Sequence, residues 1–262
     1  MNHFQIDNKK EVKKLMDLAM FAGKTMLSNG AETYRVEDTM NRICNSKENI
    51  IEVDSFVTQT GIFLTLQYDN EIFTYLKRVK NVDVNLDIVN KVNDFSRNYV
   101  NKNTSLVEAN NKLEQINNTP GYPRFLKLLG GSYVSGFFSL MFGGTYLDFF
   151  ASFIASFLAI FILDLLSNLQ LTFFVNRFIG AFFTSLFSVF TVRLGIGVNL
   201  DMIIIGAIMY LVPGVAITNS IRDTISGDSL SGISKGIEAI LSALAIAFGV
   251  GIVLNLKAKG WI

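Results

Sequence analysis

Apolar residues follow two different patterns along this chain of 262 residues. Up to about residue 120 they either recur at helical spacing or alternate with polar residues, as in half-buried strands. The order of these segments predicts two helices, three strands and two further helices, over 15–27, 31–46, 51–57, 62–66, 72–79, 86–100 and 106–116.

Turn signals separate these segments. Gly30 follows the first predicted helix, and glycine adopts the left-handed conformation at a helix C-terminus without penalty. Asp69-Asn70 predicts a hairpin turn between the second and third strands. The run from Asn117 to Pro123 contains two prolines and a glycine, so it predicts the end of a first domain, 1–120.

Beyond this break the apolar pattern is nearly continuous. Five segments each approach the ~20 residues that cross a hydrocarbon core of ~30 Å. They lie near 126–143, 146–166, 172–192, 200–218 and 233–255. The sequence therefore predicts an α-helical integral membrane protein, with about five transmembrane helices in 121–262 preceded by a small α+β cytosolic domain. The alternative, buried helices of a large soluble protein, leaves nothing in the chain to cover them.

The distribution of charge supports this division. Of 45 charged residues, 32 lie in the first 124 positions and only 11 between Phe125 and Leu256. The net charge is +1 and no basic stripe is present, which argues against a nucleic-acid partner. Cys44 is the only cysteine and His3 the only histidine, so we expect no disulfide within the chain, no metal site and no cofactor.

Two further patterns concern the membrane part. The N-terminus is polar and has no apolar leader, so the first domain is expected in the cytosol, and the basic residues near the spans follow the positive-inside rule weakly. Asp148 and Asp164 are expected to reach interfacial water. Small residues recurring every four positions predict the faces through which helices pack. They are Gly131, Ser135, Ser139 and Gly143; Gly180, Thr184 and Ser188; and Ala239, Ala243, Ala247 and Gly251.

The candidate chemistry lies where the fourth predicted span is broken. Pro213 removes a backbone donor, and Gly214 weakens the helix at the same point. Five polar residues follow, namely Thr218, Asn219, Arg222, Asp223 and Asp228. In a continuing helix Thr218 and Arg222 would share one face, as would Asn219 and Asp223. We interpret the set as a binding site for a small charged solute, because a fixed arginine and helix ends can replace the water that the solute loses. A solvated loop, with Asp228 as a helix N-cap, is the alternative.

Transport against a gradient needs energy, and the sequence has no phosphate-cradling loop of a nucleotide-driven pump. Carboxylates in partly desolvated cavities can exchange protons near neutral pH. The proton-coupling candidates are, in order, Asp223, which adjoins Arg222, then Asp228, then Glu238. Glu238 lies one turn inside the last span, where it either pairs with Lys235 or faces a polar pathway.

Three segments resemble the threonine/serine exporter family, in the family's order and over nearly the whole chain. They are Ala22-Gly23 with Leu27 and the run Gly30-Ala31-Glu32-Thr33-Tyr34-Arg35-Val36-Glu37; Val57-Thr58-Gln59-Thr60-Gly61-Ile62; and Pro213-Gly214, Thr218-Asn219, Arg222-Asp223, Gly227-Asp228 and Ser231-Gly232. The resemblance implies a multi-pass exporter of the inner (cytoplasmic) membrane, with a cytosolic N-terminal domain, that moves threonine, serine or small dicarboxylates by proton antiport. Full-length members carry about ten spans. Five spans resemble the larger subunit of the split form, whose small membrane partner supplies the other helices; a homo-oligomer is left open.

Two other classes of function compete with this interpretation. A membrane-tethered hydrolase would use Cys44 or the acids Glu32, Glu37 and Asp38, but the sequence offers no histidine base beside them. A sensor or assembly factor would use its spans only as an anchor. The polar set beside a broken helix favours transport, and we expect no enzymatic activity.

Overall fold

A computed structural model describes residues 5–80, 83–102, 104–169 and 171–262. His3 lies outside the described residues. The chain divides into two compact units. The first comprises Met1–Gly121 and Val215–Gly236, and the second comprises Tyr122–Gly214 and Ile237–Ile262. A segment that follows most of the predicted spans thus packs with the N-terminal part of the chain.

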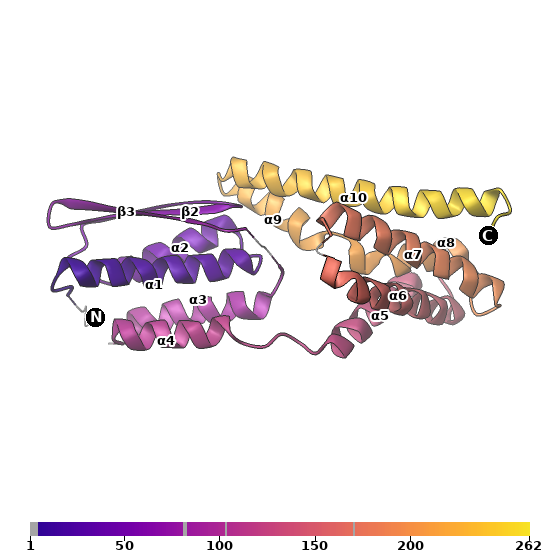
Figure 1. The fold of residues 1–262 in the computed structure, drawn as a ribbon, viewed down its shortest axis with the longest axis horizontal. Coiled ribbons are helices and arrows are strands. Elements are labelled where there is room, and N and C mark those ends of the chain that lie inside the picture. Colours follow the sequence, from indigo (N-terminus) through magenta and orange to yellow (C-terminus); the bar gives the residue numbers. More distant parts are fainter. Residues whose placement is uncertain (1–4, 81–82, 103, 170) are drawn as a thin grey trace. The chain divides into compact units, whose positions relative to one another are not determined.

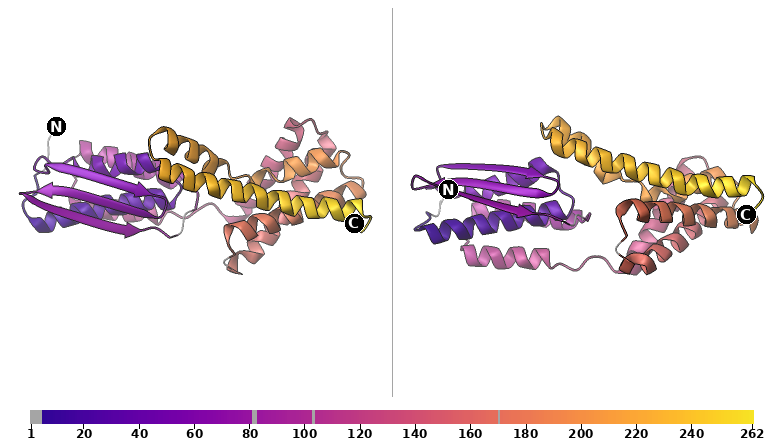
Figure 2. Two further views of the ribbon diagram at one scale, coloured as in Figure 1. Left: turned by 90° about the horizontal axis from the view of Figure 1, so that it is seen from above. Right: turned by 45° about the horizontal axis from the view of Figure 1, so that its top comes forward.

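The N-terminal part of the first unit has three layers (Figure 1). A three-stranded sheet covers one side of a helix pair, and a second helix pair covers the other side. The elements match the predicted order, and they are α1 (Lys9–Ser28), α2 (Thr33–Cys44), β1 (Glu52–Thr58), β2 (Gly61–Tyr68), β3 (Glu71–Arg78), α3 (Leu86–Asn101) and α4 (Leu106–Asn117). The two further views in Figure 2 show the helices on one face of the sheet.

The sheet is an antiparallel meander in the order β1-β2-β3. Val57 pairs with Ile62 and Leu66 with Phe73 across it, so alternate residues point toward α1 and α2. Asp69 and Asn70 both have positive φ, 49° and 60°, as a two-residue hairpin turn requires. The prediction of this turn is confirmed.

Between the layers lies a single apolar core to which α1 contributes most. Leu15, Leu18 and Met26 are at most 1% exposed, which confirms the predicted stripe of this helix. The helices α3 and α4 add Val92 and Leu113 from the opposite side. The first unit therefore has a core that does not depend on the apolar segments of the second.

The second unit and the returning segment contain the remaining helices. They are α5 (Arg124–Met141), α6 (Tyr146–Leu166), η1 (Ser167–Leu169), α7 (Phe173–Arg193), α8 (Leu200–Ala207), η2 (Met209–Leu211), α9 (Gly214–Ile225) and α10 (Ser229–Ala258). Among the described residues, three helical segments are long and apolar enough to cross a membrane: Tyr146–Leu169, Phe173–Arg193 and Ser229–Ala258. Leu200–Leu211 with Gly214–Ile225 makes a fourth if the two form one broken span. The α5 helix, over the first predicted span, is not among them.

Small side chains pack α5, α6 and α8 closely, as predicted for the first stripe. Ser135 donates to the carbonyl of Ala207 at 3.2 Å, and Ser152 donates to the carbonyl of Ile203 at 3.0 Å. A Cβ on Gly206 would lie 2.6 Å from both Cβ and N of Ser139. The helices thus meet at backbone distance, as membrane helices do when small residues line their contact.

Two expectations about this unit are wrong. On α10, Ala239 of the predicted stripe is buried, but Ala243, Ala247 and Gly251 are exposed, and the buried face continues through Ser242, Ala245, Ile246, Gly249 and Val253. A spacing of four drifts around a straight helix, so the contact face follows three- and four-residue steps. Asp148 is fully buried instead of reaching water. Its carboxylate accepts hydrogen bonds from the backbone N–H groups of Val198 and Asn199, at 2.7 and 2.9 Å.

Candidate functional site

Three segments of the first unit, far apart in the sequence, meet at one polar cluster. They are the turn between α1 and α2, the β1–β2 hairpin, and the helical hairpin of α9 with the first two turns of α10. Each segment carries one of the motifs that resemble the exporter family. We call the last of them, 215–236, the returning hairpin.

The turn between α1 and α2 has a fixed backbone shape. Gly30 has φ +87°, its N–H donates to the carbonyl of Leu27, and the Ala31 N–H donates to the carbonyl of Met26. This is a Schellman motif, which only glycine enters without strain. The Gly30 carbonyl, Glu32 and the Thr33 N–H thereby point toward the returning hairpin, as the contacts below show.

A second Schellman motif shapes the returning hairpin. Gly227 has φ +97°, its N–H donates to the carbonyl of Thr224, and the Asp228 N–H donates to the carbonyl of Asp223. The two helices then pack tightly, because a Cβ on Gly232 would lie 2.1 Å from the Thr224 hydroxyl. Gly227 and Gly232 are therefore required by the shape of the hairpin.

One face of α9 binds the α1–α2 turn. The Asn219 amide donates to the carbonyl of Gly30 at 2.9 Å, and Asp223 Oδ1 accepts from the Thr33 N–H at 3.1 Å. The predicted common face of Asn219 and Asp223 is confirmed, and it is buried. Neither residue is part of a solvated loop.

Asp223 also forms a buried ion pair. Its Oδ2 lies 2.8 Å from the ammonium of Lys235 on α10, and the two side chains are 0% and 9% exposed. Lys235 also donates to the carbonyl of Ala31 at 3.5 Å. The ion-pair partner of Asp223 is thus Lys235. The sequence instead suggested that Asp223 interacts with Arg222, and offered Glu238 as a partner of Lys235.

Asp228 sits where α10 begins. Its backbone carbonyl accepts from the Gly232 N–H, as an N-cap carbonyl does, while its carboxylate accepts from the Thr33 hydroxyl at 3.2 Å. Thr33 therefore bonds both acids of the hairpin, Asp223 through its backbone and Asp228 through its side chain. The sequence named Thr33 only as part of a motif and not as a site residue.

Arg222 lies at the edge of the cluster. Its guanidinium contacts the carboxylate of Glu32 at 2.5 Å, and the side chains are 49% and 9% exposed. Arg35 reaches the other oxygen of Glu32 at 3.4 Å. Thr218, one turn before Arg222, is exposed. Half of Arg222 faces solvent and is open to another carboxylate, whereas Glu32 is buried and would keep Arg35 as its remaining partner.

The β1–β2 hairpin contacts the first two turns of α10. Ser231 donates to the carbonyl of Val57 at 3.5 Å, and Ser234 donates to the side-chain oxygen of Gln59 at 2.5 Å. The N–H of Val57 donates in turn to Glu37 of α2 at 2.8 Å. The middle motif is thereby connected to both of the others.

Glu37 is the acid of this cluster that titrates near neutral pH. Its pKa is raised from 4.5 to about 7, and burial is the largest cause. The hydrogen bond from the Val57 N–H lowers the pKa, and the negative charges of Asp228, Asp54 and Asp223 raise it. The sequence pointed to Glu37 only as part of a motif and as a hydrolase candidate. Its burial beside other acids could not be predicted without the fold.

The acids and the thiol proposed for a hydrolase have other roles. Glu32 and Asp38 form ion pairs with Arg222 and Arg42 respectively. Cys44 is fully buried, and burial raises the pKa of its thiol to about 12, so it is not a nucleophile at neutral pH. No group of three or more metal-ligating side chains occurs within the part of the chain that the structure describes.

Pro213, Gly214 and Glu238 belong to the second unit. Pro213 stands between η2 and α9, and α9 begins at Gly214, so the helix is interrupted where the sequence predicted. A Cβ on Gly214 would meet no described atom within 4 Å. Glu238 is partly buried on α10 and has interactions of its own.

Comparison with known proteins agrees with these motifs. The family model described as "Putative threonine/serine exporter" (ThrE) matches residues 17–257. A Klebsiella aerogenes protein named "Probable succinate transporter subunit YjjP" is 25% identical over 260 residues, which are 97% of this chain and 98% of that protein. A Mycobacterium tuberculosis protein named "Probable threonine/serine exporter" is 21% identical over 247 residues, 94% of this chain but 46% of that protein. No solved structure matches. The chain is a membrane protein of a transporter family, and that family is the threonine/serine exporters.

Proposed function

We propose that the chain is the larger subunit of a two-subunit secondary exporter in the cytoplasmic membrane. Its solutes are threonine and serine or small dicarboxylates, and export is coupled to protons by antiport. The first unit lies in the cytosol. One observation carries the two-subunit part: the chain spans nearly the whole of a relative named as a subunit and about half of a relative named as an exporter. A small membrane partner would supply the helices of the other half.

The cluster supports a carboxylate as the group that is recognised. Threonine, serine and dicarboxylates share a carboxylate, and Arg222 already holds one, that of Glu32, in a half-exposed pair. The solute would take the place of Glu32 on Arg222. Asn219, Asp223 and Asp228 keep the returning hairpin in position, and Thr218 lies on the same exposed face of α9 as Arg222. Pro213 and Gly214 supply the break at which α9 begins.

Transport in proteoliposomes tests the proposal. Vesicles containing this chain with the small partner are expected to move labelled threonine or succinate uphill when a pH gradient is imposed, whereas vesicles with either protein alone do not. A protonophore removes the uphill component. Equal rates for this chain alone contradict the two-subunit arrangement, and transport that ignores the protonophore contradicts the coupling.

The same vesicles test the recognition of the carboxylate. Arg222→Lys keeps the charge but loses the planar two-point grip, so the solute concentration for half-maximal export should rise about tenfold, and Arg222→Ala should raise it further. Lys80→Gln, a change of one charge on a residue outside the cluster, is the matched control. Unchanged export by both Arg222 variants would remove the arginine from the solute site.

Protonation of Glu37 should control how firmly the returning hairpin is held. The folded protein binds the proton up to about pH 7, whereas an unfolded chain releases it near 4.5, so stability falls as the pH rises between these values. Glu37→Gln resembles the protonated acid and keeps an acceptor for the Val57 N–H. The melting temperature of the variant should therefore exceed that of the wild type more at pH 8 than at pH 5.

Glu52→Gln is the control for this experiment, because Glu52 is an exposed acid on β1. The difference in melting temperature between Glu52→Gln and the wild type should stay constant over the same range of pH. If the Glu37→Gln difference is also constant, then the acid does not titrate in this window and exerts no control over the hairpin.

A further inference from the structure

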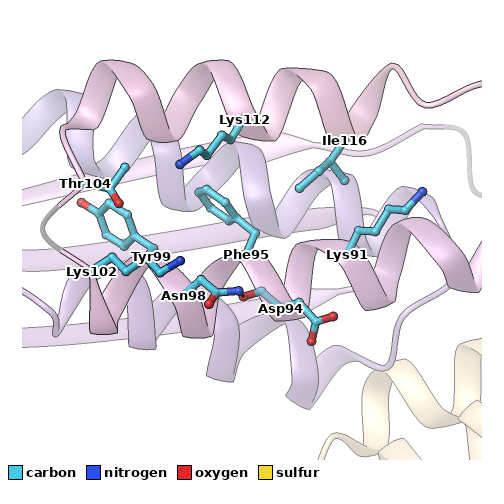
Figure 3. Close-up of a pocket in the computed structure, with 9 residues that line it drawn as sticks. All are labelled: Lys91, Asp94, Phe95, Asn98, Tyr99, Lys102, Thr104, Lys112 and Ile116. Atoms are coloured by element: carbon cyan, nitrogen blue, oxygen red, sulfur yellow. Dashed lines mark hydrogen bonds between the residues drawn. The ribbon is translucent and has the colours of Figure 1, made fainter.

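The space between α3 and α4 is a cavity separate from the polar cluster. Its volume is about 360 Å³, which is within the range of small-molecule sites. Nine residues line it: Lys91, Asp94, Phe95, Asn98, Tyr99, Lys102, Thr104, Lys112 and Ile116. Figure 3 shows that most of them project from α3 and that Lys112 and Ile116 come from α4. All of them lie in the first unit.

Aromatic rings form the wall of the cavity. Phe95 and Tyr99 stand one turn apart on α3, with ring centroids 6.1 Å apart and planes inclined by 24°. They are 8% and 4% exposed, so their positions are fixed by the core behind them. The small accessible part of this rigid ring pair offers an apolar contact to a ligand with a planar body, which gains from aromatic contact as well as from burial.

Positive charge surrounds these rings. Three lysines line the cavity against one aspartate, and a fourth, Lys47, places its ammonium 5.1 Å from the centroid of the Tyr99 ring. In the view of Figure 3 the side chains of Lys102 and Lys112 are seen beside the rings, and those of Lys91 and Asp94 point away from them. Lys91 and Lys112 pair with acids outside the lining, so Lys102 and any ammonium group released from its pair supply the attraction for an anion.

The ammonium groups of these lysines form ion pairs that a ligand in the cavity could replace. Lys112 contacts Glu108 and Lys91 contacts Asp87, each at 2.7 Å and each between side chains about half exposed. Exposed pairs four residues apart on a helix contribute little to stability, so an anion in the cavity can take over the ammonium groups. Thr104 and Asn98 add a hydroxyl and an amide for further hydrogen bonds.

We propose that the α3–α4 cavity binds a small organic anion with a carboxylate or phosphate on a planar, unsaturated body. The rings of Phe95 and Tyr99 receive the body, and Lys102 and Lys112 receive the anionic group. The site is distinct from the solute site proposed above, and its test does not require transport.

Calorimetric titration of the full-length chain in detergent tests this site. The probes are adenosine monophosphate and 4-hydroxybenzoate, which place a phosphate or a carboxylate on a planar ring. Inorganic phosphate, acetate and adenosine are the partial probes, with an anionic group or a ring only. We expect at least one complete probe to bind at least about tenfold more tightly than each of its parts, because charge and ring contacts add. The probe that binds identifies the anionic group.

Variants assign the binding to the cavity. Lys102→Gln and Lys112→Gln should each weaken binding of that probe about tenfold, the loss expected for a charged hydrogen bond. Lys77→Gln, on the exposed part of β3, should leave it unchanged. The proposal is overturned if neither complete probe binds, or if the partial probes bind as tightly as the complete one. It is also overturned if Lys77→Gln weakens binding as much as the cavity variants do.

Discussion

Asp223→Asn is expected to release the returning hairpin from the first unit. The substitution leaves the ammonium of Lys235, 9% exposed, without its negative partner. Breaking a buried ion pair in this way typically lowers the free energy of unfolding by about 3–5 kcal/mol. Uphill export should disappear as well, because α9, which is part of the returning hairpin, would no longer be held against the α1–α2 turn.

Two measurements separate this effect from a general loss of folding. Limited proteolysis should cleave near the Ser226–Gly227 turn much faster in the variant, and the melting temperature should fall. Asp201→Asn, an exposed acid in the first turn of α8, is the matched control. Replacing both partners, with Leu at Asp223 and Met at Lys235, should recover part of the stability, since no charge is then left buried. If Asp223→Asn is cleaved no faster than the wild type, then water solvates Lys235 in the variant.

Gly206→Val is expected to disrupt the second unit. A Cβ on Gly206 would lie 2.6–2.7 Å from N, Cα and Cβ of Ser139, so rotation of a side chain cannot relieve the clash. The helices α5 and α8 must then move apart, which breaks the hydrogen bond from Ser135 to the Ala207 carbonyl. Overpacking of this kind lowers the free energy of unfolding by about 1–3 kcal/mol or more.

Size-exclusion chromatography and melting of the detergent-purified protein measure this loss. Gly130→Ala in α5 is the control, because a Cβ there would meet no described atom within 4 Å. We expect Gly130→Ala to match or slightly exceed the wild type, since alanine is the better helix former. A monodisperse Gly206→Val protein with unchanged melting would show that α5 and α8 can separate freely.

Much of the first unit could be predicted from the sequence, because its signals are local. The change of period near Ile50, the Asp69-Asn70 turn and the stop at Gly30 each depend on neighbouring residues. The break at Pro213 and the common face of Asn219 and Asp223 also follow from local chemistry. These features agree with the structure.

The cluster itself could not be predicted, because the contacts of the returning hairpin with the N-terminal segments join residues 174–204 positions apart in sequence. Hydropathy shows that 200–218 is apolar enough for a membrane but does not show that α9 binds the α1–α2 turn. The pairing of Lys235 with Asp223 depends on the Gly227 turn, which sets α10 against α9. The resemblance to a family indicated the residues, and only the fold shows that three motifs form one cluster.

The distance in sequence between the two halves of the cluster affects how the protein is made. Asn219 follows Gly30 by 189 residues, so at ~5–20 residues per second the ribosome adds α9 about 10–40 seconds after the α1–α2 turn. The N-terminal core, complete by α4, can form during that interval. Thr33 and Glu32 then remain exposed to water and to chaperones until the last helices have been synthesised. The contacts of the cluster therefore form late in biogenesis. They can be present only in a chain whose synthesis has passed the returning hairpin.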